Sequence, residues 1–334
     1  MLFSNDENKM RVKLWGVRGS LPSPQSPAIL EQRVKEVATL ALEQGLKPGT
    51  IEFESWFNAL PPHRKGGYGG NTPCIEVRTS KTRIIVDAGS GLRALGAELM
   101  QGPCGKGQGE VHLLFTHFHW DHLAGLPFFI PIFVPGNTIH LYGVQPDLDA
   151  MVKMLFHKPY FPVEFDKIGA KVVVHTLQPR EKVTFGDIQV TPYQLDHPDP
   201  CWGYRFEHEG KAYSHCVDTE AVRVSRQEMG PDLPLYQNVD LMVFDAQYTL
   251  METIEKVHWG HAAASIGLDI ALREGIRRII FMHHDPAAGD ERIYNVEQQT
   301  RRYYERMVKH MREAGEPVVD VEWSFAIEGI EIEV

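Results

Sequence analysis

The sequence predicts a single layered α/β domain. The chain has 334 residues, of which 43% are hydrophobic and 23% are charged, a composition typical of a globular protein with a sizeable core. Short apolar runs with strand character dominate its middle, and segments with helical spacing lie between and after them. This mixture is typical of strands and helices that pack in layers around one core.

The first predicted element is a strand over residues 12–17, which runs into a turn-rich loop. Ser26 and Pro27 then predict the start of a helix, because serine is a favoured N-cap and proline a favoured first helical residue. From the end of this helix to the next strand we expect irregular chain. We interpret residues 24–65 as an insertion or cap in a domain that covers residues 10–334.

The remaining elements follow from apolar runs of strand length and from helical periodicity. We expect Asp290 to cap the last and longest helix. Strands are predicted over residues 75–78, 83–86, 111–115, 171–175, 188–195, 204–207, 211–216, 241–244, 278–282 and 318–323. Helices are predicted over 92–99 and 290–315, and another helix carries Ile266 and ends at Gly275.

Charge and composition exclude several classes of protein. The net charge is −10, whereas affinity for long nucleic acids comes mainly from lysine and arginine side chains that neutralise phosphates. No apolar stretch has the length of a membrane span, and the first residues lack an apolar leader. The 4 cysteines are widely spaced and predict free thiols. We therefore expect a cytoplasmic protein without membrane or long nucleic-acid partners, and a homodimer stays open.

A histidine-rich turn carries the strongest chemical signal. Residues 116–122, Thr-His-Phe-His-Trp-Asp-His, directly follow a buried apolar strand. His117 and His119 can project to one side, and Asp121 and His122 can face a neighbouring point. Imidazole and carboxylate groups together suit zinc, manganese or iron. The sequence therefore predicts a metal site at the end of this strand.

The turn at residues 117–122 resembles the HxHxDH signature of the metallo-β-lactamase superfamily. Residues 87–91 (Asp-Ala-Gly-Ser-Gly) are similar to its upstream Asp-x-Gly turn. Residues 15–20 and 69–74 resemble the branch that contains phosphoribosyl cyclic phosphodiesterases and cyclic-nucleotide phosphodiesterase-like proteins. The resemblance covers nearly the whole chain outside the insertion. It implies an αββα sandwich of two mixed sheets with helices outside and a two-metal site at one edge.

The resemblance also implies the remaining metal ligands. His197 and Asp218 each follow a predicted strand, and Asp218 matches the aspartate that bridges both metals. His283 and His284 compete for the last position; adjacent residues on an extended chain point opposite ways, and alignment to the family's final strand favours His283. The implied ligands are His117, His119 and His197 for the first metal and Asp121, His122 and His283 for the second, with Asp218 shared. Zinc is the expected metal, and manganese or iron stays open.

His261 begins a predicted helix and, by the same resemblance, is the general acid beside the metals, with His258 as a fallback. Asp121 and Asp218 complete the implied catalytic groups. Ala262 follows His261 where transfer-RNA-processing nucleases of the branch have serine or threonine. We expect Asp87 to orient the ligand loop by hydrogen bonding, and we expect substrate contacts from Arg18, Ser20, Asn71 and His284, although Arg18 fits a surface ion pair equally well.

These features predict a metal-dependent phosphodiesterase that acts on a small, cyclic or linear phosphodiester, with a cyclic one favoured. In this reading a hydroxide shared by two divalent ions attacks phosphorus, and His261 protonates the leaving oxygen. A cation pair also explains how an acidic chain could accept an anionic substrate. A lactonase or thioesterase on the same site and a structure-specific ribonuclease are the enzymatic alternatives, and a binding module with an inactive site is the non-enzymatic one.

Overall fold

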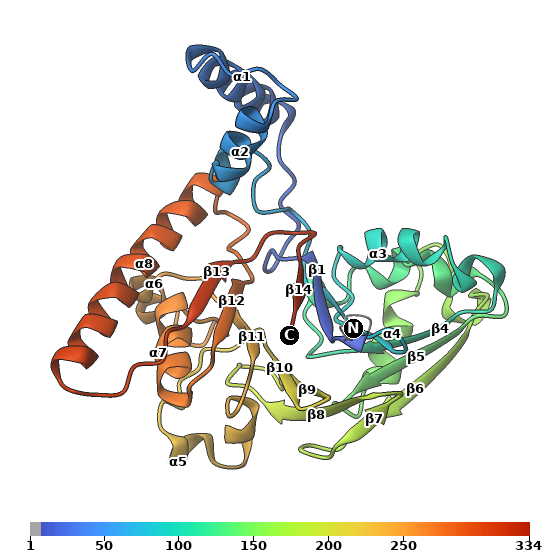
Figure 1. Cartoon of the computed structure of the whole chain (residues 1–334). Coiled ribbons are helices and arrows are strands. Elements are labelled where there is room, and N and C mark those ends of the chain that lie inside the picture. The colour runs from blue at the N-terminus through green and yellow to red at the C-terminus, as the bar shows by residue number, and fades with distance from the viewer. Residues whose placement is uncertain (1–7) are drawn as a thin grey trace, which may run out of the picture.

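The computed structural model describes residues 8–334, and within them the strands form two seven-stranded mixed sheets (Figure 1). The first sheet has the order β14-β1-β2-β3-β4-β5-β6 and the second the order β13-β12-β11-β10-β9-β8-β7. The first sheet consists of β1 (Arg11–Gly16), β2 (Cys74–Arg78), β3 (Arg83–Val86), β4 (Glu110–Leu114), β5 (Thr138–Gly143), β6 (Lys171–Thr176) and β14 (Glu331–Glu333). The second consists of β7 (Val183–Phe185), β8 (Ile188–Gln194), β9 (Trp202–His208), β10 (Lys211–Cys216), β11 (Leu241–Asp245), β12 (Arg278–Met282) and β13 (Glu322–Phe325).

Helices cover the outer face of each sheet. α3 and α4 pack on the first sheet, and α7 and α8 pack on the second. The bounds are α1 Pro27–Glu43, α2 Ile51–Ala59, α3 Leu92–Leu99, α4 Leu148–Leu155, α5 Arg226–Met229, α6 Leu250–Glu255, α7 Ala264–Glu274 and α8 Asp290–Glu313. The αββα sandwich that the sequence predicted is therefore confirmed. None of the helices in the described part of the chain is long and apolar enough to cross a membrane.

Side-chain alternation along the strands builds the layers. In β4, Val111 and Leu113 pack with the outer helices, whereas Leu114 joins the cluster between the two sheets. In β1, Val12 and Leu14 are fully buried between the sheets and the residues beside them are half-buried. Period-two alternation of this kind assigns one face of each strand to the central core and the other to the helix layer.

Strand direction creates the edge where the predicted ligands meet. β3, β4, β5 and β6 run parallel, and so do β10, β11, β12 and β13. Parallel strands bring their carboxyl ends to one edge. Asp87, Asp218 and His283 each lie just after such a strand with a φ of 63°, 62° and 66°. This left-handed conformation is unusual for residues other than glycine, and it is often found at functional sites.

The structure corrects several predicted elements. The segment expected to be irregular contains α2, which Thr50 caps by accepting a hydrogen bond from the amide of Phe53. β5, β7, β14 and α4 were not predicted. Asp290 lies in the first turn of α8 and does not cap it, since Gly289 occupies the N-cap position. The final predicted strand, 318–323, is replaced by β13, which begins at Glu322.

The helix after Ser26 is confirmed: α1 begins at Pro27, and the Ser26 side chain accepts a hydrogen bond from the amide of Ile29. Figure 1 shows α1 and α2 projecting together from the sandwich, away from the two sheets. Few of their residues are buried, with only Arg33 and Ala41 buried in α1 and none in α2. The interpretation of residues 24–65 as an insertion or cap stays a prediction.

Candidate metal centre

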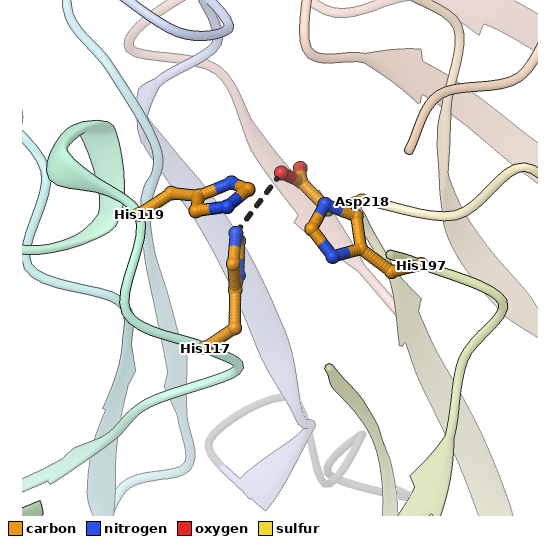
Figure 2. A group of neighbouring side chains, drawn as sticks. All are labelled: His117, His119, His197 and Asp218. Atoms are coloured by element: carbon orange, nitrogen blue, oxygen red, sulfur yellow. Dashed lines mark ion pairs between the residues drawn. The ribbon is translucent and has the colours of Figure 1, made fainter. Parts of the chain in front are cut away.

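Four predicted ligands meet at the edge of the sandwich (Figure 2). His117 and His119 lie in the loop after β4, His197 follows β8, and Asp218 follows β10. Each offers one ligand atom, and these atoms all lie within 4.8 Å of one another. The His117 Nε2 atom is 3.3 Å from the Asp218 Oδ2 atom. Residues that span about a hundred positions of sequence thus point at one centre.

A second group shares Asp218 with the first. Asp121, His122, Asp218 and His283 also place one ligand atom each within 4.8 Å of one another. His283 Nε2 lies 3.0 Å from Asp218 Oδ1 and 3.1 Å from Asp121 Oδ2. His122 Nε2 lies 3.2 Å from Asp121 Oδ2 and 3.3 Å from Asp218 Oδ2. We call these seven residues of the two groups the metal centre.

Buried polar atoms without hydrogen-bond partners mark the metal centre. The Nε2 atoms of His117, His122 and His197 and both carboxylate oxygens of Asp218 are buried and unpartnered. Such atoms cost free energy unless something satisfies them. Imidazole nitrogen and carboxylate oxygen form a donor set that divalent zinc, manganese or iron accepts. The residues therefore fit two divalent cations, one in each group.

The pKa shifts of His283 and Asp218 are consistent with a site that holds positive charge. Burial opposes the charged form of His283, but Asp218 and Asp121 outweigh it and raise the pKa of His283 to about 10. Burial likewise opposes the charge on Asp218, yet the neighbouring imidazoles of His283 and His122 hold its pKa well below the usual range. The carboxylates thus favour the charged form of His283 at this edge. Divalent cations would compete for the same positions, because metal binding to histidine displaces protons.

Hydrogen bonds from outside the metal centre orient its ligands. Asp87 Oδ2 lies 2.8 Å from His122 Nδ1, and its Oδ1 accepts a 2.9 Å bond from the amide of Thr116. Gln247 Oε1 lies 2.8 Å from His283 Nδ1. A Cβ at Gly19 would lie only 2.4 Å from the same Nδ1 atom, so a larger residue would displace the ring. Partners of this kind fix the ring orientation of metal-binding histidines.

His261 lies beside the second group. Its ring stacks on that of His283 with centroids 4.8 Å apart and is 6.3 Å from the ring of His197. Asp245 Oδ2 lies 2.9 Å from His261 Nδ1, and Asp245 Oδ1 accepts a 3.0 Å bond from the amide of Ala262. Because Nδ1 is occupied, Nε2 is the nitrogen left to exchange a proton.

Sequence reasoning missed Asp245. It is fully buried at the end of β11 and belongs to a third group of candidate ligands with Asp218, His261 and His283. A signal was present in the sequence, since Asp245 ends a buried apolar strand much as Asp218 follows one. The prediction ended that strand one residue earlier and did not consider its carboxylate.

The structure places Arg18 in a buried ion pair, and its expected contact with a substrate stays a prediction. Its side chain is buried, and its Nη2 atom forms a 3.1 Å ion pair with Asp290 Oδ1. The guanidinium also donates to the backbone oxygens of Gly69 and Ala288. Asp290 Oδ2 accepts a 3.0 Å bond from Arg33, on α1. Arg18 therefore ties the loop after β1 to the start of α8 and to the projecting helices.

The other predicted substrate contacts have different surroundings. His284 is buried, stacks on Phe325 and binds the Ala326 oxygen through Nε2, so it faces away from the metal centre. Asn71 is half-buried; its amide nitrogen donates to Glu328, and its oxygen accepts from Ser90. Ser20 contacts the metal centre through its backbone, which donates a 2.8 Å bond to Asp121 Oδ2, and its side chain is exposed.

Comparison with known proteins assigns the family. A family model described as "Beta-lactamase superfamily domain" matches residues 82–284, which include the whole metal centre. The chain belongs to the β-lactamase superfamily. The family that the motifs predicted, a superfamily of metal-dependent hydrolases, is therefore confirmed. Together with the ligand groups, the family match indicates divalent metal ions as cofactors.

Several relatives within the superfamily resemble the chain. Ribonuclease Z of Pyrococcus abyssi is 29% identical over 166 residues, 48% of this chain and 50% of that protein. Ribonuclease Z of Pyrococcus horikoshii is 26% identical over 145 residues, 42% of this chain and 44% of that protein. The chain thus spans about half the length of these curated relatives.

Solved structures share the fold over nearly the whole chain. The metallo-β-lactamase fold protein YhfI from Bacillus subtilis gives a TM-score of 0.62 at 16% identity and covers 98% of this chain and 100% of its own. Unliganded yeast PDE1 gives 0.58 at 15% identity and covers 98% and 100%. A diphosphatase of the PhnP family gives 0.56 at 16% identity and covers 98% of both chains. At sequence identities of 15–16%, the structural similarity shows that these proteins share a fold with this chain and carries no information on function.

Proposed function

We propose that this chain is a metal-dependent phosphodiesterase that hydrolyses a small cyclic phosphodiester. The observation that carries the proposal is the Asp245–His261 pair beside the metal centre, with Nδ1 of His261 2.9 Å from Asp245 Oδ2. Hydrolysis of a phosphodiester must protonate an alkoxide leaving group, and an imidazole held by a carboxylate suits that task. An ester or lactone hydrolase with a good leaving group needs this acid less.

The ligand set proposed for the two cations is the metal centre. His117, His119 and His197 would hold one cation, and Asp121, His122 and His283 the other, with Asp218 between them. We propose zinc, because histidine and aspartate are among its usual ligands. When bound, the cations supply positive charge for a phosphate and lower the pKa of water toward neutrality.

Side chains of the protein have separate roles in the hydrolysis. Water adds its oxygen to phosphorus and releases a proton, and the bond from phosphorus to the leaving oxygen breaks. The leaving oxygen takes a proton from His261, which the proton released by water replaces, and the product is a phosphate monoester with a free hydroxyl. Asp121 and Asp218 would hold the cations in position, and His261 Nε2 would give its proton to the leaving oxygen. Asp245 would hold the His261 ring in the required orientation. Asp87 does the equivalent for His122.

A substrate panel tests the proposal. The protein would be prepared without metal, loaded with Zn²⁺, Mn²⁺ or Fe²⁺, and assayed on cyclic mononucleotides, cyclic dinucleotides, phosphoribosyl cyclic phosphate and a lactone. We expect turnover of at least one cyclic phosphodiester, abolished by chelation and strongly reduced in His261→Ala. Cleavage of the lactone alone, with no effect of His261→Ala, would replace the phosphodiesterase with a lactonase.

A ribonuclease is the second candidate, because the curated relatives named above are ribonucleases Z. Two features disfavour it: the net charge is −10, and Ala262 offers no hydroxyl beside His261. Precursor transfer RNA, added to the same panel, decides between them. Cleavage of the RNA at a single site, with no turnover of small phosphodiesters, would favour the ribonuclease.

A further inference from the structure

A buried network of ion pairs lies outside residues 82–284, the range that matches the family model. It consists of Arg18, Arg33 and Asp290, whose exposed fractions are 2%, 8% and 8%. Asp290 Oδ1 lies 3.1 Å from Arg18 Nη2, and its Oδ2 lies 3.0 Å from Arg33 Nη2. Because the loss of hydration offsets most of the attraction between buried charges, such pairs contribute little to the net stability of a fold. Stability alone therefore does not explain why these three charges are buried.

The Asp290 carboxylate connects separate segments of the chain. Gln25 Nε2 donates a 2.6 Å bond to Asp290 Oδ2, and the amide of Tyr68 donates a 3.2 Å bond to Oδ1. Gln25 Oε1 in turn accepts a 3.0 Å bond from Arg33 Nη1. Gln25 and Arg33 belong to the predicted insertion at residues 24–65, whereas Tyr68 lies in the loop before β2. One carboxylate in the first turn of α8 thus joins the insertion to loops of the sandwich.

The ion pair between Arg33 and Asp290 links α1 to the sandwich. Arg33 is one of two buried residues in α1. A groove of about 1190 Å³ is lined both by residues of α1 and by residues 286–291, which lead into α8. The rings of His63 and Tyr294, with centroids 4.2 Å apart, bring the end of the insertion against α8. Beside this open groove, the Arg33 guanidinium is a buried contact through which the position of α1 can affect Asp290.

The two residues after Arg18 contact the second ligand group. The backbone of Gly19 lies so close to His283 that a Cβ at Gly19 would be 2.4 Å from the Nδ1 atom of His283. The amide of Ser20 donates a 2.8 Å bond to Asp121 Oδ2. Because Arg18 is held by Asp290, a shift of Arg18 would move the backbone that touches two proposed ligands of the second cation.

We propose that Asp290 is a positioning residue for the metal centre. Through Arg18 it holds the next two residues against the second ligand group, and through Arg33 it makes this hold depend on the docking of α1. Among the described residues, no hydrogen bond joins residues 18–20 to the three histidines of the first group. Loss of the network should therefore weaken the second cation selectively. The inference rests on the metal ligands of the proposed function and holds for any substrate.

Stepwise metal binding tests the inference without a substrate. Metal-free protein would be titrated with Zn²⁺ against a competing chelator, and the binding step that His283→Ala weakens identifies the second cation. Asp290→Asn keeps the size of the side chain and removes the charge that faces both arginines. We expect it to weaken the second cation about tenfold, the lower end of the range for groups that orient metal ligands, and to leave the first within about twofold.

Variants of Arg33 test the contribution of α1. Arg33→Gln leaves the pair between Arg18 and Asp290 in place, so it should weaken the second cation by a smaller factor than Asp290→Asn. Arg33→Lys keeps the positive charge and should lie closer to wild type. If Asp290→Asn does not fold, Arg33→Gln decides, and an unchanged constant for the second cation would overturn the inference.

A buried carboxylate elsewhere in the chain provides the matched control. The Glu274 side chain is 1% exposed and faces Arg226 and Arg273 at the C-terminal end of α7. Glu274→Gln should change neither binding constant. Equal weakening of both cations in Asp290→Asn, or no more change than in Glu274→Gln, would overturn the positioning role. A wild-type chain that binds fewer than two cations would overturn the proposed ligand set and the inference with it.

Discussion

Two histidine-rich regions of this molecule differ in chemistry. The metal centre is one; the other, which we call the histidine ladder, consists of His112, His140 and His175 on the adjacent strands β4, β5 and β6, with Glu110 and Tyr142. His140 Nδ1 lies 2.9 Å from His175 Nε2, and its Nε2 lies 3.1 Å from Glu110. His112 Nδ1 lies 3.1 Å from the hydroxyl of Tyr142.

The difference shows what makes histidines a metal site. The ladder histidines are half-buried, and none of their nitrogens is buried without a partner. In the metal centre, three imidazole nitrogens and a shared carboxylate are buried and unpartnered. Histidines close together on a sheet can satisfy one another, whereas carboxylates that converge with buried imidazoles without hydrogen bonds leave polar atoms that a cation can satisfy. The following experiments test or refine this contrast.

The largest effect is expected for Asp218→Asn. Asp218 belongs to both ligand groups, so its loss should remove both cations and lower activity by more than the roughly 10²–10⁴-fold that loss of a general acid costs. Metal content by mass spectrometry should fall from two per chain toward none. A chain that retains two cations and full activity after this substitution would contradict the shared-carboxylate assignment.

His261→Asn should come next. We expect kcat to fall by roughly 10²–10⁴-fold, while metal content stays at two, because His261 would give a proton and hold no cation. The loss should be larger for an alkyl leaving group than for p-nitrophenolate, which needs little protonation. Loss of a metal ion in this variant would make His261 a ligand instead, in agreement with its place in the third candidate group.

Asp87→Asn should have a smaller effect. The substitution weakens the hydrogen bond between residue 87 and His122 Nδ1. Asparagine tolerates the left-handed backbone at this position. Metal affinity or activity should fall by about 10–100-fold, measured by competition with a chelator and by kcat/KM. A loss as large as that of Asp218→Asn would mean that Asp87 binds metal directly.

His140→Asn should leave the metal centre intact. The substitution removes the central residue of the histidine ladder. Because His140 does not contact the metal centre, we expect two cations per chain and activity within about twofold of wild type. A drop in metal content would show that the ladder binds a cation of its own and would remove the contrast drawn above.

The ladder should also make a small contribution to pH dependence. Burial lowers the pKa of His112 and of His175 below the usual value. The unfolded chain therefore binds protons more readily there, and the free energy of unfolding should decrease as pH falls below about 6.5. Denaturant titrations from pH 7 to pH 5 should show a shallower decrease in the variant with both residues changed to asparagine. An unchanged slope would mean that neither histidine stays neutral in the folded protein.

Local patterns predicted much of the fold. Apolar runs located most central strands, and Ser26-Pro27 located the start of α1, because strand burial and helix capping depend on a few adjacent residues. The patterns failed for α2, whose residues are exposed or half-buried and give little periodic signal. They also failed for β14, a strand of 3 residues that pairs with β1 from the far end of the chain.

Side-chain direction was harder to predict than element type. His283 and His284 are adjacent, and the structure turns His283 into the metal centre and His284 toward Phe325. Arg18 is polar and lies in a loop near the site, yet its guanidinium is buried against Asp290, which is 272 residues away. No local pattern contains such distant partners.

Short motifs and hydrophobic periodicity were enough to predict the superfamily, the layered fold and the local chemistry of residues 117–122. Which distant carboxylates and imidazoles meet depends on the folded chain, since parallel strands from two sheets must first bring their carboxyl ends to one edge. The tertiary structure also separated the metal centre from the histidine ladder: an unpartnered buried nitrogen is a property of the packed neighbours and cannot be read from the identity of the residue.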